Sequence, residues 1–261
     1  MSDIKLYNGD CLELMKLIPD KSIDLILCDL PYGITRNKWD SIIPLDKLWR
    51  QYERVVKDNS AICLFADGMF MAKLMASNPK MWRYNLIWNK VLPSGFLNAN
   101  RMPLRVTEEI VVFYNKQPIY NPQKIKGAPN HSKGKATNKT SEDNCQVNNN
   151  YGKYTIVDNH KELGDMKHPT SLITFSKPHP SISLHPTEKP IQLCEWLIKT
   201  YTNENMVVLD NCMGSGSTGV ACLNTNRNFI GIELDEGYYN IANKRIESAQ
   251  SDIDKNVEKG R

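Results

Sequence analysis

The chain has 261 residues, of which 41% are hydrophobic, and a formal net charge of +4. This composition supports a folded core and excludes wholesale disorder, and no stretch reaches the roughly eighteen apolar residues that a membrane-spanning helix requires. The N-terminus lacks the apolar region of a signal peptide, and the seven cysteines form no C-x-x-C pair. We therefore expect a cytoplasmic protein with reduced thiols.

Segments with the periodicity of strands and helices alternate along the first 114 residues. Strands are predicted at 4–9, 23–28, 61–66, 85–89 and 109–114, and helices at 11–18, 45–57 and 69–77. The alternation resumes after residue 184, with helices at 190–201, 217–224 and 236–249 and strands at 206–209 and 229–234. Alternation of this kind is typical of right-handed crossovers. The predicted fold class is therefore α/β, a doubly wound and mostly parallel sheet.

Residues 115–184 interrupt this pattern. They lack clear periodicity, are rich in proline, glycine and asparagine, and contain ten lysines against five acidic residues. Their net charge is +5 against +4 for the whole chain, so the remaining residues carry −1. A local basic excess indicates contact with a polyanion. We predict an α/β domain formed by residues 1–114 and 185–249, an inserted recognition region at 115–184, and a charged tail at 250–261 that frays.

A strand, a loop of small residues and the start of a helix follow one another at residues 206–219. Gly214, Gly216 and Gly219 permit a tight turn, and the helix N-terminus offers unpaired N–H groups to a ligand. Glu233 ends the next predicted strand, where its carboxylate can accept hydrogen bonds from both hydroxyls of a ribose. The three glycines satisfy G-x-G-x-x-G, so a nicotinamide or flavin cofactor is an alternative. However, three residues separate Asp210 from the first glycine, which favours S-adenosylmethionine.

A second motif, Asp29-Leu30-Pro31-Tyr32, follows a buried strand. Carboxyl ends of strands face the ligand crevice in doubly wound sheets. The Asp29 carboxylate and the Leu30 carbonyl can accept the two hydrogens of one amino group, while Pro31 favours extended backbone at Leu30 and Tyr32 offers a flat face to a base. Two such acceptors direct the lone pair of the amino nitrogen toward a methyl donor, so catalysis would depend on alignment and charge placement. The alternative is an ordinary turn after a strand.

Together and in this order, the two motifs resemble the beta class of DNA amino-methyltransferases, over about residues 4–249. Family members carry Asp-Pro-Pro-Tyr where this chain has Asp29-Leu30-Pro31-Tyr32, so the resemblance implies that these four residues are catalytic. It also implies S-adenosylmethionine as cofactor, S-adenosylhomocysteine as product, and no metal. Aspartate rather than serine at position 29 favours adenine N6 over cytosine N4. The family's sheet is circularly permuted, with the strand ending at Asp210 inserted between the strands that carry Asp10 and Asp29.

The resemblance also assigns residues to the cofactor. Asp10 would contact the adenine amino group, Glu233 the ribose, and the helix opened by Thr187-Glu188-Lys189-Pro190 the methionine end. The full predicted set is Asp10, Thr187, Lys189, Asp210, Gly214, Gly216, Ser217, Thr218 and Glu233. Asn211-Cys212 stands where the family has Pro-Phe, and Ser217 where it has threonine.

Double-stranded DNA is the predicted partner. Its target base would flip into the pocket, and the inserted region would read neighbouring bases. Contacts with DNA are predicted at Arg36, Lys38, Lys90, Lys124, Lys126, Lys133, Lys135 and Lys139, mostly with phosphates. The resemblance also suggests a homodimer and a bacterial or phage enzyme working at the nucleoid. Three alternatives stay open: a cytosine-N4 DNA methyltransferase, a methyltransferase of RNA or protein amides, and a non-catalytic DNA-binding module.

Overall fold

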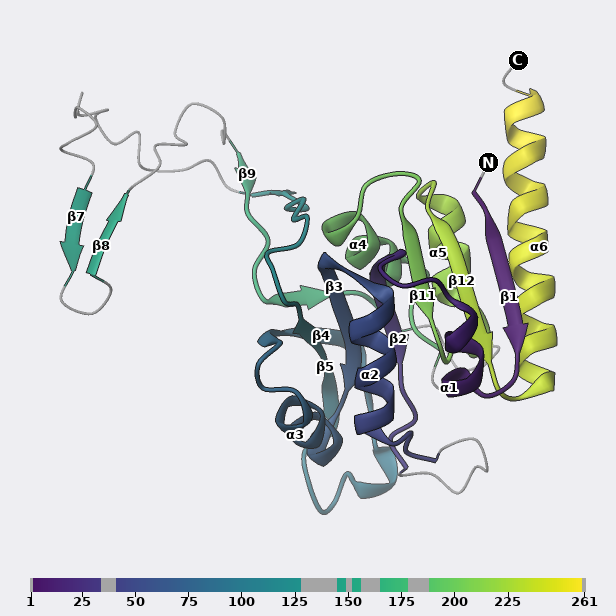
Figure 1. The fold of residues 1–261 in the computed structure, drawn as a ribbon. Coiled ribbons are helices and arrows are strands. Elements are labelled where there is room, and N and C mark those ends of the chain that lie inside the picture. Colours follow the sequence, from purple (N-terminus) through teal and green to yellow (C-terminus); the bar gives the residue numbers. More distant parts are fainter. Residues whose placement is uncertain are drawn as a thin grey trace. The chain divides into compact units, whose positions relative to one another are not determined.

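The computed structural model describes residues 2–33, 41–127, 145–148, 152–155, 165–177 and 188–259 (Figure 1). The chain divides into two compact units, Met1–Asn121 with Thr170–Arg261, and Pro122–Pro169. The second unit is thus shorter at both ends than the predicted insert at 115–184. None of the helices in the described ranges has the length and apolar character needed to cross a membrane.

The first unit contains an eight-stranded sheet. Its order is β1 (Ile4–Asn8), β12 (Asn228–Glu233), β11 (Val207–Asp210), β2 (Ile23–Asp29), β3 (Val56–Ala66), β5 (Arg105–Phe113), β4 (Trp82–Ser94) and β10 (Leu172–Thr174). Of these described strands, β5 is antiparallel to both neighbours, and all other neighbouring pairs are parallel. The predicted mostly parallel sheet is confirmed. Because β11 lies between β12 and β2, the circular permutation is confirmed as well.

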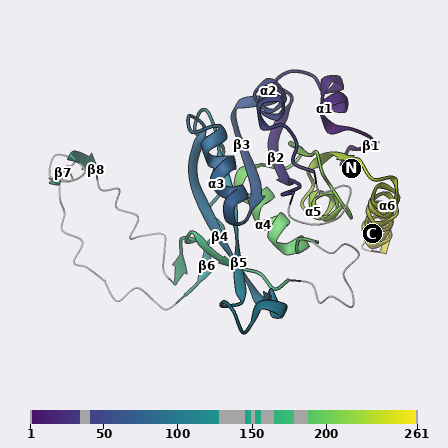
Figure 2. The ribbon, with the colours of Figure 1, turned by 90° about the horizontal axis from the view of Figure 1, so that it is seen from below.

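Helices cover both faces of the sheet (Figure 2). One face packs against α1 (Cys11–Leu14), α2 (Leu45–Val55) and α3 (Gly68–Ser77), and the other against α4 (Ile191–Tyr201), α5 (Ser217–Asn224) and α6 (Glu236–Lys259). Strand β2 is buried on both faces because successive side chains of a strand point to opposite faces. Leu25 and Leu27 pack on the side of α4, α5 and α6, and Ile26 and Cys28 pack on the side of α1, α2 and α3. A strand buried on both faces requires the nearly continuous apolar run that the sequence contains there.

Several elements differ from their predicted bounds. The helix predicted at 11–18 divides into α1 and a 3₁₀ turn, η1 (Met15–Leu17), and β4 is longer than predicted. Helix α6 continues to Lys259, past its predicted end at 249 and through most of the tail that was expected to fray. The side-chain hydrogen bond from Gln250 to Asp254, at 2.9 Å, shows the i,i+4 pairing that supports this extension.

Strand β10 joins the sheet although it lies inside the predicted insert. It pairs in parallel with β4, and the N–H groups of Ile87 and Phe175 donate to the carbonyls of Ser171 and Asn89 at 2.7 and 3.2 Å. Three residues are too few to show strand periodicity, so hydropathy alone did not reveal this strand. Residues Leu172–Thr174, which lie within the predicted insert, are therefore part of the sheet of the first unit.

The second unit contains short antiparallel pairs in its described parts. β6 (Ile125–Lys126) pairs with β9 (Met166–Lys167), and β7 (Cys145–Asn148) pairs with β8 (Gly152–Thr155). Lys126 also forms an ion pair with Asp165 at 3.6 Å.

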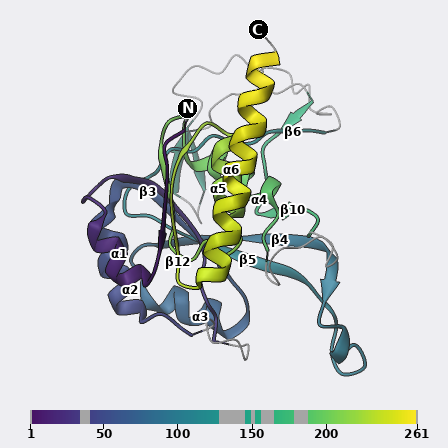
Figure 3. The same cartoon turned by 90° about the vertical axis from the view of Figure 1, so that its right-hand side faces the viewer.

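The strand directions determine where functional groups gather. Because β1, β12, β11, β2, β3 and β4 run the same way, their carboxyl ends lie at one edge of the sheet, and the antiparallel β5 begins there. Beyond this edge β4 and β5 continue as a hairpin (Figure 3), which includes η2 (Phe96–Asn98). Asp210, Asp29 and Glu233, which end their strands, and Glu108, near the start of β5, consequently lie at the same edge.

Candidate active site

A cavity of about 390 Å³ opens at this edge of the sheet. It brings together both predicted motifs, because the β11 strand is inserted beside β2. The predicted catalytic and cofactor residues that line it are Asp10, Asp29, Leu30, Pro31, Tyr32, Lys189, Asp210, Ser217, Thr218 and Glu233. Gly214 and Gly216 form the turn beside the cavity, both with positive φ.

The carboxyl group of Asp210 ties the glycine loop to helix α5. It accepts hydrogen bonds from the Cys212 N–H at 3.1 Å and from the Thr218 hydroxyl at 2.7 Å. Burial raises the pKa of Asp210 to about 7, although both hydrogen bonds oppose this change. This carboxyl group is therefore only partly ionised at neutral pH and acts chiefly as a structural acceptor.

Glu233 supports the same loop from the neighbouring strand. Its carboxylate accepts from the Gly214 N–H at 2.8 Å and from the Asp235 N–H at 2.9 Å. Burial raises its pKa. Since each carboxylate oxygen has two acceptor positions, the group can also bind hydroxyls of a ligand. Asp10, at the N-cap of α1, accepts from the Leu12 N–H at 2.8 Å and lines the same end of the cavity.

Three further interactions around the loop were not expected from the sequence. Arg245 of α6 forms an ion pair with Glu188 at 2.6 Å and donates to the Ser215 carbonyl at 3.2 Å. The Tyr52 hydroxyl of α2 donates to Oδ1 of Asn211 at 2.5 Å. An arginine or tyrosine on an amphipathic helix has no local signal that separates such a contact from ordinary surface or core packing. Such a contact is revealed only by the residues that lie beside the side chain in the tertiary structure.

At the other end of the cavity, both oxygens of Asp29 have partners. Oδ1 accepts from the Tyr32 hydroxyl at 2.9 Å, and Oδ2 accepts from Lys189 at 2.5 Å. The ring of Tyr32 stacks on Phe70 with a centroid separation of 4.8 Å. Burial and the nearby Asp29 carboxylate raise the pKa of Tyr32 well above its ordinary value, so the phenol remains a hydrogen-bond donor.

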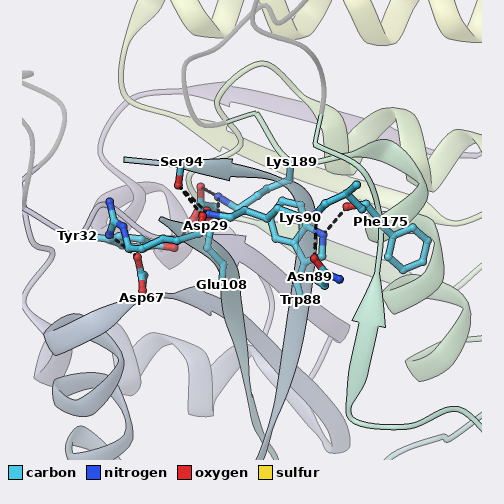
Figure 4. A network of polar contacts seen from close by, with 12 residues as sticks. Asp29, Tyr32, Asp67, Trp88, Asn89, Lys90, Ser94, Glu108, Phe175 and Lys189 are labelled. Atoms are coloured by element: carbon cyan, nitrogen blue, oxygen red, sulfur yellow. Dashed lines mark hydrogen bonds and ion pairs between the residues drawn. The ribbon is translucent and has the colours of Figure 1, made fainter. Parts of the chain in front are cut away.

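Lys189 and Lys90 enclose Glu108 beside Asp29 (Figure 4). Nζ of Lys189 lies 3.7 Å from Oε2 of Glu108, and Nζ of Lys90 lies 3.1 Å from Oε1. Burial alone would lower the pKa of Lys189, but Asp29 and Glu108 outweigh it and raise that pKa. Burial likewise favours protonation of Glu108, but the two ammonium groups outweigh it and lower its pKa. Lys189 and Glu108 are therefore both charged at neutral pH.

The predicted DNA contacts have different outcomes. Lys90 is 2% exposed, and its ammonium group pairs with Glu108 inside the protein, so its predicted contact with DNA stays a prediction. Lys124 and Lys126 are exposed in the second unit. Six predicted residues lie outside the described ranges: Arg36, Lys38, Lys133, Lys135, Lys139 and Thr187.

The two ends of the cavity differ chemically. One end combines a helix N-terminus with carboxylates that can accept hydrogen bonds from hydroxyl and amino groups. The other presents Asp29 and an aromatic ring beside the buried Leu30. This arrangement suits a nucleoside-type ligand at the first end and an amino group of a planar ring at the second.

Comparison with known proteins gives matches over most of the chain. The model of the N6/N4 methyltransferase family, described as DNA methylase, matches residues 23–244. The type II methyltransferase M.BglII of Bacillus subtilis is 28% identical over 269 residues, covering 91% of this chain and 67% of the relative.

Two solved structures extend the comparison. The complex of M1.HpyAVI with S-adenosylmethionine has a TM-score of 0.61 at 25% identity, over 93% of this chain and 99% of that one. The cytosine-N4-specific PvuII DNA methyltransferase has a TM-score of 0.65 at 15% identity, over 96% and 92% of the two chains. At that identity the PvuII likeness concerns the fold alone.

Proposed function

We propose that this chain, which belongs to the N6/N4 family of DNA methylases, transfers a methyl group from S-adenosylmethionine to adenine N6 in double-stranded DNA. The observation that carries the proposal is the single cavity shared by Asp29-Leu30-Pro31-Tyr32 and the glycine loop after Asp210. S-adenosylmethionine supplies an electrophilic methyl group. The protein supplies positioning and charge placement, and the methylated amino group then loses one proton to give the neutral product.

The cofactor end of the cavity fits this molecule. We assign the ribose hydroxyls to Glu233 and the adenine amino group to Asp10, because both carboxylates line the cavity and retain acceptor positions. Ser217 and Thr218 begin α5 beside them. The Arg245–Glu188 pair and the Tyr52–Asn211 hydrogen bond hold this end of the cavity in place before the cofactor binds.

At the acceptor end, Asp29 and the Leu30 carbonyl would receive the two hydrogens of the adenine amino group. This pairing localises the lone pair of the nitrogen, which is otherwise delocalised into the ring, and Asp29 stabilises the positive charge that develops as the new bond forms. Tyr32 holds Asp29 through its hydroxyl and presents its ring to the base. The amino group lies inside duplex DNA, so the base must be flipped outward first.

The decisive experiment measures transfer of labelled methyl groups to duplex DNA, followed by mass spectrometry of the digested DNA. Asp29→Ala is expected to abolish transfer while leaving the Kd for S-adenosylmethionine within about twofold, since Asp29 contacts the base end. Asp20→Asn, an exposed carboxylate before β2, is the matched control and should keep full activity. Undiminished methylation by Asp29→Ala would contradict the assignment.

The same experiment separates the alternatives. N4-methylcytosine in the digest would replace the adenine proposal, for which aspartate at position 29 is the supporting residue. Competition by RNA or by protein amides would identify a different acceptor, and complete absence of transfer with intact DNA binding would indicate a non-catalytic module.

We assign recognition of the DNA sequence to the inserted region, for which the basic excess of residues 115–184 is the support. Exposed Lys124 and Lys126 would contact phosphates. Replacing either by alanine should weaken binding similarly for all sequences and reduce the slope of log K against log salt by about 1. An unchanged salt slope would remove that lysine from the interface.

A homodimer is the proposed assembly. The β4–β5 hairpin exposes Phe96 and Leu97, which are 80% and 97% exposed, together with Met102. Apolar side chains gathered on one projection are typical of an interaction surface. Sedimentation equilibrium of the wild type and of Leu97→Asp tests this assembly: the wild type should be dimeric and the variant monomeric, and a monomeric wild type would refute it.

A further inference from the structure

The partners of Asp29 create a conflict with the proposed reaction. Lys189 donates to Oδ2 of Asp29 at 2.5 Å, so the carboxylate that must receive the substrate amino group already holds a cation. During methyl transfer the amino nitrogen becomes positively charged. A lysine ammonium retained on the same carboxylate would repel that charge and weaken the stabilisation that Asp29 provides.

Deprotonation does not remove the conflict. The side chain of Lys189 is 10% exposed, and its two carboxylate neighbours keep it charged. The charged groups that line this end of the cavity also include Arg105, Asp67 and Lys177; Arg105 is paired with Asp67 at 2.7 Å. A cation that stays charged must instead change its partner.

Glu108 offers that second partner. Its Oε2 lies 3.7 Å from Nζ of Lys189, beyond a good hydrogen bond but within reach of a small side-chain movement. Its Oε1 is held by Lys90 at 3.1 Å, and Lys90 also donates to the Ser94 hydroxyl at 3.1 Å. Lys90 thus fixes Oε1 of Glu108, and the other oxygen, Oε2, is directed toward Lys189 (Figure 4).

We propose that Lys189 is an exchangeable counter-ion, which holds Asp29 in place before the substrate binds and moves to Glu108 when the amino group arrives. Lys189, Glu108 and Lys90 are then positioning residues that act through Asp29. This inference rests on the proposed methylation of a DNA amino group. It replaces the predicted contact of Lys189 with the methionine end of the cofactor.

The key variant is Glu108→Gln, which keeps the shape of the side chain but removes the charge that receives Lys189. Lys189 then stays on Asp29. We expect kcat to fall by about tenfold or more, while the Kd values for S-adenosylmethionine and DNA remain within about twofold. Glu109→Gln is the matched control, because the neighbouring Glu109 bonds to Asn85 at 2.7 Å instead and should tolerate the change.

A double variant separates exchange from a structural role. Adding Lys189→Met to Glu108→Gln removes the cation that is trapped on Asp29, so kcat should recover relative to Glu108→Gln alone. A residue that merely supports the fold would give a further loss. Thermal unfolding of each variant checks that the fold is retained.

The position of Lys189 can also be observed directly. In a crystal structure with target DNA and a non-reactive cofactor analogue, Nζ of Lys189 should lie closer to Glu108 than to Asp29. The proposal is overturned if Lys189 remains on Asp29 there, if Glu108→Gln keeps the wild-type kcat, or if the double variant shows no recovery. A weaker Kd for S-adenosylmethionine in Lys189→Met would assign the lysine to the cofactor and likewise overturn it. Failure of the wild type to methylate DNA would instead refute the proposed function.

Discussion

The Asp210→Asn variant tests whether a buried carboxyl group behind the cofactor loop makes stability depend on pH. Asp210 is 4% exposed, and its pKa is raised from 3.8 to about 7. An acid with a raised pKa in the folded state keeps its proton there while the unfolded chain has lost it. Stability therefore falls as the pH rises from about 3.8 to about 7, and asparagine removes this loss.

The magnitude follows from the two pKa values. At about 1.4 kcal/mol for each pH unit, the ionised carboxylate costs the fold up to about 4 kcal/mol at pH 8. Between pH 5 and pH 8 the free energy of unfolding of the variant, relative to wild type, should increase by about 2–3 kcal/mol. Asparagine can still accept from the Cys212 N–H and can donate to the Thr218 hydroxyl, so the packing of the loop is retained.

Urea unfolding followed by tryptophan fluorescence at pH 5, 6, 7 and 8 measures this difference directly. Comparing the variant with wild type cancels the contributions of other titrating groups, including Glu233. If the two proteins show parallel stability profiles across this range, the carboxyl group of Asp210 does not titrate as inferred and the reasoning fails.

Three further predictions concern the same cavity. Gly216→Ala should lower the free energy of unfolding by about 1–3 kcal/mol. The backbone φ of Gly216 is +81°, and the new Cβ would lie 3.0 Å from the Cβ of Ala242 on α6. An unchanged urea midpoint would contradict this prediction. Tyr52→Phe removes the buried hydroxyl that donates to the side chain of Asn211. The free energy of unfolding, measured in urea, should fall by about 1–3 kcal/mol, and the affinity for S-adenosylmethionine, measured by calorimetry, should also fall. Equal values for the variant and the wild type would argue against this prediction. The ion pairs of Lys189, whose pKa is raised, are complete below pH 10.5 and lost as the pH rises through that raised value. Thermal unfolding should therefore show a larger alkaline loss of stability in the wild type than in Lys189→Arg, and an equal loss in both proteins would refute the assignment.

Much of the fold follows from local patterns. The strands before Asp29 and Asp210 and the helix Ser217–Asn224 were predictable because apolar periodicity and glycine spacing are properties of short segments. Strand β10 was not, since three residues carry too little pattern, and the antiparallel direction of β5 is not encoded in its hydropathy. The extension of α6 through a charged segment includes the i,i+4 hydrogen bond between Gln250 and Asp254, which composition alone does not reveal.

The candidate site likewise contains residues that could be predicted from the sequence and residues that could not. Asp29, Tyr32 and Glu233 could be named from the sequence because each lies at or just after the end of a strand, in a motif of recognisable spacing. Lys189, the partner of Asp29, could not be named in this way, because it lies 160 positions away along the chain. The strand order and the placement of α4 bring it close to Asp29. The sequence by itself determined which chemical groups stand at the strand ends. Only the tertiary structure decided which charges face one another, because an ion pair depends on distance and direction between segments that no one-dimensional pattern relates.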